Sequence, residues 1–197
     1  MKTVLIVLGV IVLILVIGFA SLFGVYNGFV TAEQSVNEKW AQVQNVYQRR
    51  TDLIPNLVET VKGFAAQEKT VLEAVTQARA SASGIKATPE LLNDPVAFKK
   101  FQDAQNQLGG ALSRLLVTVE RYPELKSNQN FLALQSQLEG TENRITVERM
   151  RFNEAVRDYN TKIKLMPGAL VAGMMGFKEK AFFEAAPGSE TVPKVKF

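Results

Sequence analysis

Apolar residues at the start of the chain form one uninterrupted run. Residues 4–23 are twenty consecutive positions without a charged side chain, and most of them are Val, Leu or Ile. Twenty residues at the rise of an α-helix span about 30 Å, which is the thickness of the hydrocarbon core of a bilayer. A secretory signal peptide usually has a shorter apolar region, although Gly18, Phe19 and Ala20 resemble a cleavage site. We therefore expect a transmembrane anchor, residues 1–25.

Two features of this anchor bear on its orientation and its contacts. Lys2 precedes the run, which favours an inside N-terminus and a domain outside the membrane. Ala20, Gly24 and Gly28 recur at every fourth position, a spacing that lets two transmembrane helices approach closely. The alternative is that the spacing arose by chance, because this segment is rich in small residues.

After the anchor, apolar side chains recur at alternating intervals of four and three, and only Arg50 and Glu68 interrupt them. Such a heptad pattern predicts a long helix that packs along a coiled-coil seam. The positions are Val36, Trp40, Val43, Tyr47, Arg50, Ile54, Leu57, Val61, Phe64, Glu68, Val71, Val75, Ala78 and Ala82.

Pro55 lies inside this pattern and allows two interpretations. It could open a second helix after a hairpin, with Thr51 or Asp52 as the cap, because a proline in the first turn of a helix costs little. Alternatively, it could kink one helix that runs from about Tyr26 to Ser83. The heptad phase is the same on both sides of the proline, and this favours one kinked helix, about 85 Å long at 1.5 Å per residue.

Two further long helices are predicted from later apolar stripes. Asp94 followed by Pro95 resembles a helix start, and Tyr122-Pro123 resembles the end of that helix. The next helix opens near Ser127 and stops before Pro167. The fold class is therefore all-α: an N-terminal transmembrane helix followed by an up-down antiparallel bundle of three long helices plus a short C-terminal helix.

We expect the bundle domain to comprise residues 26–186. Its C-terminal part is rich in Met and Phe. Its last segment, from Leu170 to Ala186, predicts a short helix that caps the bundle, or a contact surface for a partner or a lipid interface. Residues 187–197 are expected to form a flexible tail.

The first predicted helix is longer than the two later ones, which reach about 50 and 57 Å. On this comparison Val36, Trp40 and Val43 lie uncovered near the membrane, and exposed apolar strips usually mark an interface. We therefore expect a homo-oligomer, with Ala20, Gly24 and Gly28 as further interface candidates.

Composition narrows the chemistry. The chain has no Cys and no His, which excludes thiolate or imidazole metal ligands and nucleophile pairs that need either residue. It also excludes the Glu-x-x-His motif of di-metal helical bundles. The 23 basic and 19 acidic residues are interleaved, which argues against nucleic acid as a partner. We expect no catalytic site, cofactor or metal.

Several motifs resemble the bacterial LemA family. They comprise Arg49–Gly63 (RRTDLIPNLVETVKG), Val75–Arg79, Glu142–Ile145, Arg151–Val156, Asp158–Thr161, Gly176-Phe177 and Phe182–Glu184. The resemblance covers nearly the whole chain and departs from the pattern at Phe152, where many members have Tyr. It implies a single-pass helical protein of the bacterial cytoplasmic membrane, linked to the cell envelope, and it implies no particular activity.

The first motif also has a physical interpretation. A kink at Pro55 frees backbone carbonyls in the preceding turn, which Arg49, Arg50 or Asn56 could satisfy beside Asp52. The motif therefore shapes a bend or forms a docking surface, and the sequence leaves both open. As a whole, the sequence favours a membrane-anchored scaffold that binds its own copies and other envelope proteins. The alternative is an envelope-stress sensor or regulator that signals through its anchor.

Overall fold

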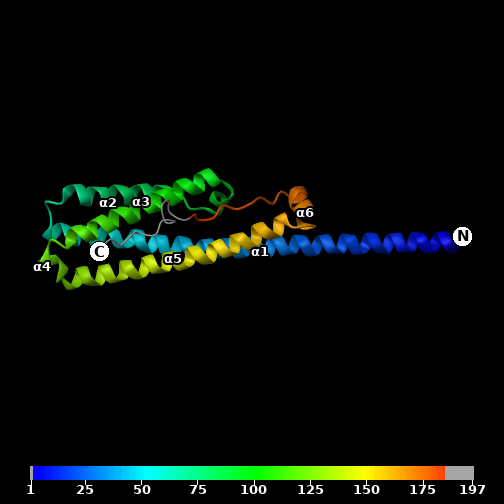
Figure 1. Ribbon diagram of the computed structural model, residues 1–197, viewed down its shortest axis with the longest axis horizontal. Coiled ribbons are helices and arrows are strands. Elements are labelled where there is room, and N and C mark those ends of the chain that lie inside the picture. The colour runs from blue at the N-terminus through cyan, green and yellow to red at the C-terminus, as the bar shows by residue number, and fades with distance from the viewer. Residues whose placement is uncertain (1, 185–197) are drawn as a thin grey trace, which may run out of the picture.

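The computed structural model describes residues 2–184, and these residues form an elongated, all-helical molecule. The elements are α1 (Lys2–Phe64), α2 (Lys69–Gly84), the short 3-10 helix η1 (Pro89–Asn93), α3 (Pro95–Val119), α4 (Pro123–Lys126), α5 (Gln129–Lys164) and α6 (Gly168–Met175). Helices α1 and α3 run in one direction and α2 and α5 in the other, so the antiparallel bundle is confirmed (Figure 1). The predicted tail, residues 187–197, lies outside the described residues.

Helix α1 is one element of 63 residues that contains both the apolar run and Pro55. Its N-terminal part projects alone beyond the bundle, and the rest packs along α5 (Figure 1). It is long and apolar enough to cross a membrane, and its apolar part is not buried by the rest of the chain. Pro55 therefore lies inside one helix, as expected, and the hairpin interpretation is wrong.

The predicted end of this first helix at Ser83 is also wrong. The chain turns over residues 65–68 and folds back as α2, so the bundle has four long helices in place of three. Ala65 is buried at the turn, and Glu68 accepts hydrogen bonds from the Tyr122 hydroxyl at 2.8 Å and the Arg121 guanidinium at 3.1 Å. Contacts with the α3–α4 connection therefore stabilise a turn that the heptad pattern conceals.

The predicted starts of the later helices agree well with the structure. Asp94 caps α3 by accepting hydrogen bonds from the backbone N–H groups of Val96 and Ala97, at 2.9 and 3.0 Å. Asn128 caps α5 by accepting from the Phe131 N–H at 3.1 Å, one residue beyond the expected start. Capping of this kind satisfies N–H groups that have no partner inside the helix.

The bundle has two apolar clusters, one near the anchor and one at the far end. Trp40 lies at the centre of the first, with only 1% of its surface exposed. Its ring lies 5.8 Å from that of Phe98 on α3, 5.2 Å from that of Phe152 on α5 and 6.2 Å from that of Phe183. Val36 and Val43 are fully buried beside it. The expectation that Val36, Trp40 and Val43 face water is therefore wrong, because these three side chains form the core.

Candidate functional site

The chain after α6 forms an extended segment that is clamped to the bundle. Helix α6 ends at Met175, and the next residue, Gly176, has a φ of 78°, in the left-handed region that favours glycine. Residues 177–184, which we call the strap, then run back along the helices without forming one (Figure 1). The Ala181 N–H donates to the Leu92 carbonyl of η1 at 2.8 Å.

Three side-chain amides hold the strap by its backbone, and each both donates and accepts. Asn160 of α5 bonds to the carbonyl and the N–H of Lys180, both at 2.9 Å. Asn153 of α5 does the same with Phe183, also at 2.9 Å. Gln102 of α3 pairs with Glu184, at 2.8 and 3.3 Å. Because these contacts involve backbone groups, the clamp fixes the path of the strap independently of its side chains.

Lys180 anchors the strap by charge as well. Its ammonium group is buried, and it donates to the Glu33 carboxylate at 2.7 Å and to the Asn93 side chain at 3.0 Å. It also lies 5.4 Å from the centre of the Tyr159 ring. Burial, with a smaller contribution from the Glu33 carboxylate, raises the pKa of Tyr159 to about 12. This group joins the strap and α5 to the membrane-proximal part of α1.

A second buried polar cluster centres on Arg50, the residue that interrupts the heptad stripe. Its guanidinium group donates to Glu142 of α5 at 3.0 Å and to the Gln105 side chain of α3. It also lies 5.0 Å from the centre of the Tyr47 ring. Arg50 therefore connects three helices, and it does not satisfy carbonyls at the bend as the sequence suggested.

The backbone carbonyl that Pro55 leaves without a helical partner has a different donor. Proline lacks the N–H that would bond to the Thr51 carbonyl one turn earlier. Arg79 of α2 donates its Nε–H to this carbonyl at 3.0 Å. The donor lies in a second motif, and sequence reasoning missed it because it treated α2 as a continuation of α1. The other residues expected to shape the bend, Arg49, Asp52, Pro55 and Asn56, lie on the exposed face of α1.

The predicted interface candidates separate into two groups. Val36, Trp40 and Val43 belong to the core, as described above. Ala20 and Gly24 are exposed on the lone part of α1, and Gly28 is half-buried. A methyl group added at Gly24 or Gly28 would meet no atom within 4 Å. This face of α1 is therefore open to lipid or to a second helix.

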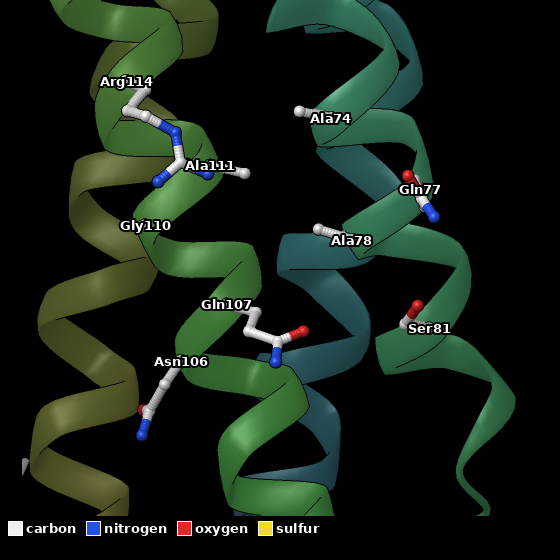
Figure 2. Close-up of a pocket in the computed structure, with 9 residues that line it drawn as sticks. All are labelled: Ala74, Gln77, Ala78, Ser81, Asn106, Gln107, Gly110, Ala111 and Arg114. Carbon is white, nitrogen blue, oxygen red and sulfur yellow. The ribbon is translucent and has the colours of Figure 1, made fainter.

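An open groove between α2 and α3 was not predicted (Figure 2). Ala74 and Ala78 of α2 and Ala111 of α3 point into the space between the two helices, and Gln107 reaches towards it. The full lining is Ala74, Gln77, Ala78, Ser81, Asn106, Gln107, Gly110, Ala111 and Arg114. Small side chains form the floor of this groove, and amide and guanidinium groups lie around it. Over residues 2–184, no three Asp or Glu side chains come together in a way that could hold a metal ion.

Comparisons with known proteins agree with the motifs. The LemA family model matches residues 39–197. Magnetosome protein MamQ of Magnetospirillum gryphiswaldense is 30% identical over 93% of this chain and 74% of its own length. Magnetosome protein MamQ 2 of Paramagnetospirillum magneticum is 29% identical over 91% and 72%, and Protein LemA of Metamycoplasma hominis is 23% identical over 81% and 69%. With its apolar N-terminal helix and helical bundle, this chain belongs to the LemA family.

Proposed function

We propose that this protein is a membrane-anchored helical scaffold of the bacterial cytoplasmic membrane that self-associates and binds other envelope proteins. The observation that carries the proposal is the continuity of α1. One helix of 63 residues, about 95 Å at the helical rise, includes both the anchor and one wall of the bundle. The bundle is therefore a stiff extension of the anchor and holds bound proteins at a fixed distance from the bilayer.

Buried polar contacts support this stiffness. The Arg50–Glu142 ion pair joins α1 to α5, and the Lys180–Glu33 ion pair joins the strap to α1. Breaking such a pair would leave a buried charge without its partner, which proteins tolerate poorly. The bundle thus moves with α1 as one body.

Two surfaces support binding. The small side chains in the α2–α3 groove would let a partner helix approach closely, and Arg114 offers a charge for an acidic side chain on that helix. Where α1 leaves the membrane, the face with Ala20, Gly24 and Gly28 would let a second copy pack against the anchor. In this role the protein binds other proteins and catalyses no reaction. We also propose an inside N-terminus with the bundle outside, from the charge before the span.

The mass of the full-length protein in mild detergent tests self-association. We expect an oligomer that dissociates when Gly24 is replaced by Ile, because a larger side chain would separate the two backbones. The matched control is Gly18→Ile, a similar change on a different face of the same helix, which should leave the mass unchanged. A monomeric wild-type protein would contradict self-association, and equal effects of the two substitutions would contradict the assigned face of α1.

A sensor or regulator that signals through the anchor is the second candidate. The specific observation that favours it is the buried Lys180–Glu33 ion pair, because it links the C-terminal strap to α1 close to the membrane. A regulator would need the strap to leave the bundle when a signal arrives. Hydrogen exchange of the strap in the full-length protein separates the two functions: slow exchange of residues 180–184 under all conditions supports the scaffold.

A further inference from the structure

We propose that α6 and the residues beside it dock onto the surface of the same bilayer that α1 crosses. This contact would be a second attachment to the membrane, in addition to the span. It requires the anchor but does not depend on self-association or on any partner protein.

Helix α6 packs against α1 next to the membrane span. Gly168, at its start, packs so closely against Phe29 of α1 that an added Cβ would come within 2.9 Å of the Phe29 ring. The ring of Phe177, just after α6, lies 5.2 Å from that of Phe29 and 5.8 Å from that of Tyr26. Helix α6 therefore lies beside residues 26–29, at the end of the bundle where α1 continues alone (Figure 1).

The residues of α1 that contact α6 lie only a short distance beyond the end of the span. If the apolar run ends at Phe23, then Tyr26 lies about 4.5 Å and Phe29 about 9 Å further along α1 at 1.5 Å per residue. The headgroup layer on one side of a bilayer is about 5–7 Å thick, from the difference between total and hydrocarbon thickness. Helix α6 is thus at the level of the headgroups and the adjoining water.

Several large side chains exposed at this end are apolar. Val171 and Ala172 of α6 face the bundle, whereas Met174 has 82% of its surface exposed. The other large apolar residues exposed here are Leu165, Met166, Leu170 and Met175. An exposed apolar face on a short helix beside the span gains by burial at the boundary between lipid headgroups and acyl chains.

Two further observations favour the bilayer, and not a protein, as the partner of this apolar surface. Exposed apolar side chains are also present on α1 itself, where Tyr26 and Val30 are exposed on the part of the helix that lies beside α6. Exposed lysines, Lys162 before α6 and Lys178 after it, flank the cluster and suit contact with lipid phosphates. An apolar patch bordered by lysines and beside a transmembrane helix fits a lipid surface.

The natural absence of cysteine allows a direct test with the full-length protein. A Met174→Cys variant would carry an environment-sensitive fluorophore and be reconstituted in phosphatidylcholine–phosphatidylglycerol vesicles. Some of the lipids would carry a nitroxide quencher near the headgroup. The matched control is Val117→Cys, which is similarly exposed, at 71%, but lies near the far end of α3. Emission from the buried Trp40 would verify that both variants are folded.

We expect the lipid quencher to reduce emission from position 174 several-fold more than emission from position 117. We also expect a water-soluble quencher to show the opposite order. Equal lipid quenching at the two positions would overturn the proposal. A label at position 174 that is shielded from water but not quenched by lipid would overturn it as well, because a protein would then cover α6.

Discussion

Replacing Pro55 with Ala should stabilise the bundle. Pro55 lies inside α1 with its ring exposed, so the smaller side chain removes no core contact. The substitution returns the N–H that bonds to the Thr51 carbonyl and removes the clash of the ring with the preceding turn. Arg79 now donates to this carbonyl at 3.0 Å, and its importance should fall once the helix supplies its own donor.

The magnitude follows from these opposing terms. A proline in a helix interior costs about 3 kcal/mol relative to alanine. Loss of the restriction that proline imposes on the unfolded chain offsets about 0.4–1 kcal/mol of this gain. We therefore expect Pro55→Ala to raise the free energy of unfolding by about 2 kcal/mol. Arg79→Met should cost about 1.5–3 kcal/mol in the natural sequence, because it leaves the carbonyl without a donor. In the Pro55→Ala background it should cost about 1 kcal/mol less.

Urea unfolding in mild detergent measures all four members of this double-mutant cycle. The single tryptophan, Trp40, is buried in the bundle, so its emission reports loss of tertiary packing. A destabilising Pro55→Ala substitution would show that the proline is not a cost to α1. An equal cost of Arg79→Met in both backgrounds would show that Arg79 does not compensate for the missing N–H.

Three other substitutions test the buried polar contacts. Glu142→Gln should lower the free energy of unfolding by about 1–2 kcal/mol, because Arg50 keeps its buried charge while its half-exposed partner becomes neutral. Asn160→Ala removes two hydrogen bonds to the backbone of Lys180 and should cost about 2 kcal/mol; trypsin should then cleave the strap faster. Burial raises the pKa of Tyr159 from 10.0 to about 12, so the unfolded chain ionises first as the pH rises. The contribution of neutral Tyr159 to the free energy of unfolding should therefore be fully present below pH 10 and be lost between pH 10 and 12. Tyr159→Phe should make this loss smaller.

Controls on the surface distinguish these effects from general damage. Glu59→Gln breaks an exposed ion pair with Lys62 on the same helix and should change stability by less than about 0.5 kcal/mol. Asn45→Ala removes an exposed amide and should leave trypsin cleavage of the strap unchanged. Burial also raises the pKa of Tyr47, so some loss of stability at high pH should remain in Tyr159→Phe. Effects of the buried substitutions no larger than those of the controls would contradict the assigned contacts.

The long helices could be predicted because their ends and faces have local chemical signals. Asp94-Pro95 marks the start of α3, since an aspartate can accept from the first free N–H groups and a proline needs no acceptor there. The apolar run of residues 4–23 needs no tertiary partner to be recognised as long enough to span a bilayer. The position of Pro55 inside one helix followed from the uninterrupted heptad phase.

The same heptad phase concealed the turn between α1 and α2. Residues 65–69 are Ala, Ala, Gln, Glu and Lys, all of which favour helices, so local propensity opposes a turn. Buried positions on both sides of the turn also keep a spacing of three or four, from Val61 and Ala65 to Leu72 and Val75. Contacts between Glu68 and the α3–α4 connection, which is far away in the sequence, stabilise the turn.

The error at Trp40 has the same origin. With the first helix expected to end at Ser83, the later helices were too short to cover its membrane-proximal part, whereas α1 ends at Phe64 and Trp40 packs against Phe98 of α3 and Phe152 of α5. In the structure the strap supplies Phe183, and the connection before η1 supplies the Ala87 carbonyl, which accepts from the Trp40 indole N–H at 3.0 Å. Extended segments held by side-chain amides show no periodicity, so the strap and its clamp could not be predicted from apolar spacing.

The continuity of α1 from the membrane into the bundle is the central claim, and a spin-label distance measurement tests it most directly. Labels on Ser21→Cys and Asn45→Cys would report from the span and from the bundle in full-length protein placed in lipid nanodiscs and diluted with unlabelled copies. Both positions are exposed, and the chain has no other cysteine. An unbroken helix predicts one narrow distribution near 36 Å, from 24 residues at 1.5 Å each. A broad distribution, or several separate distances, would show a hinge between the anchor and the bundle and would contradict the rigid scaffold.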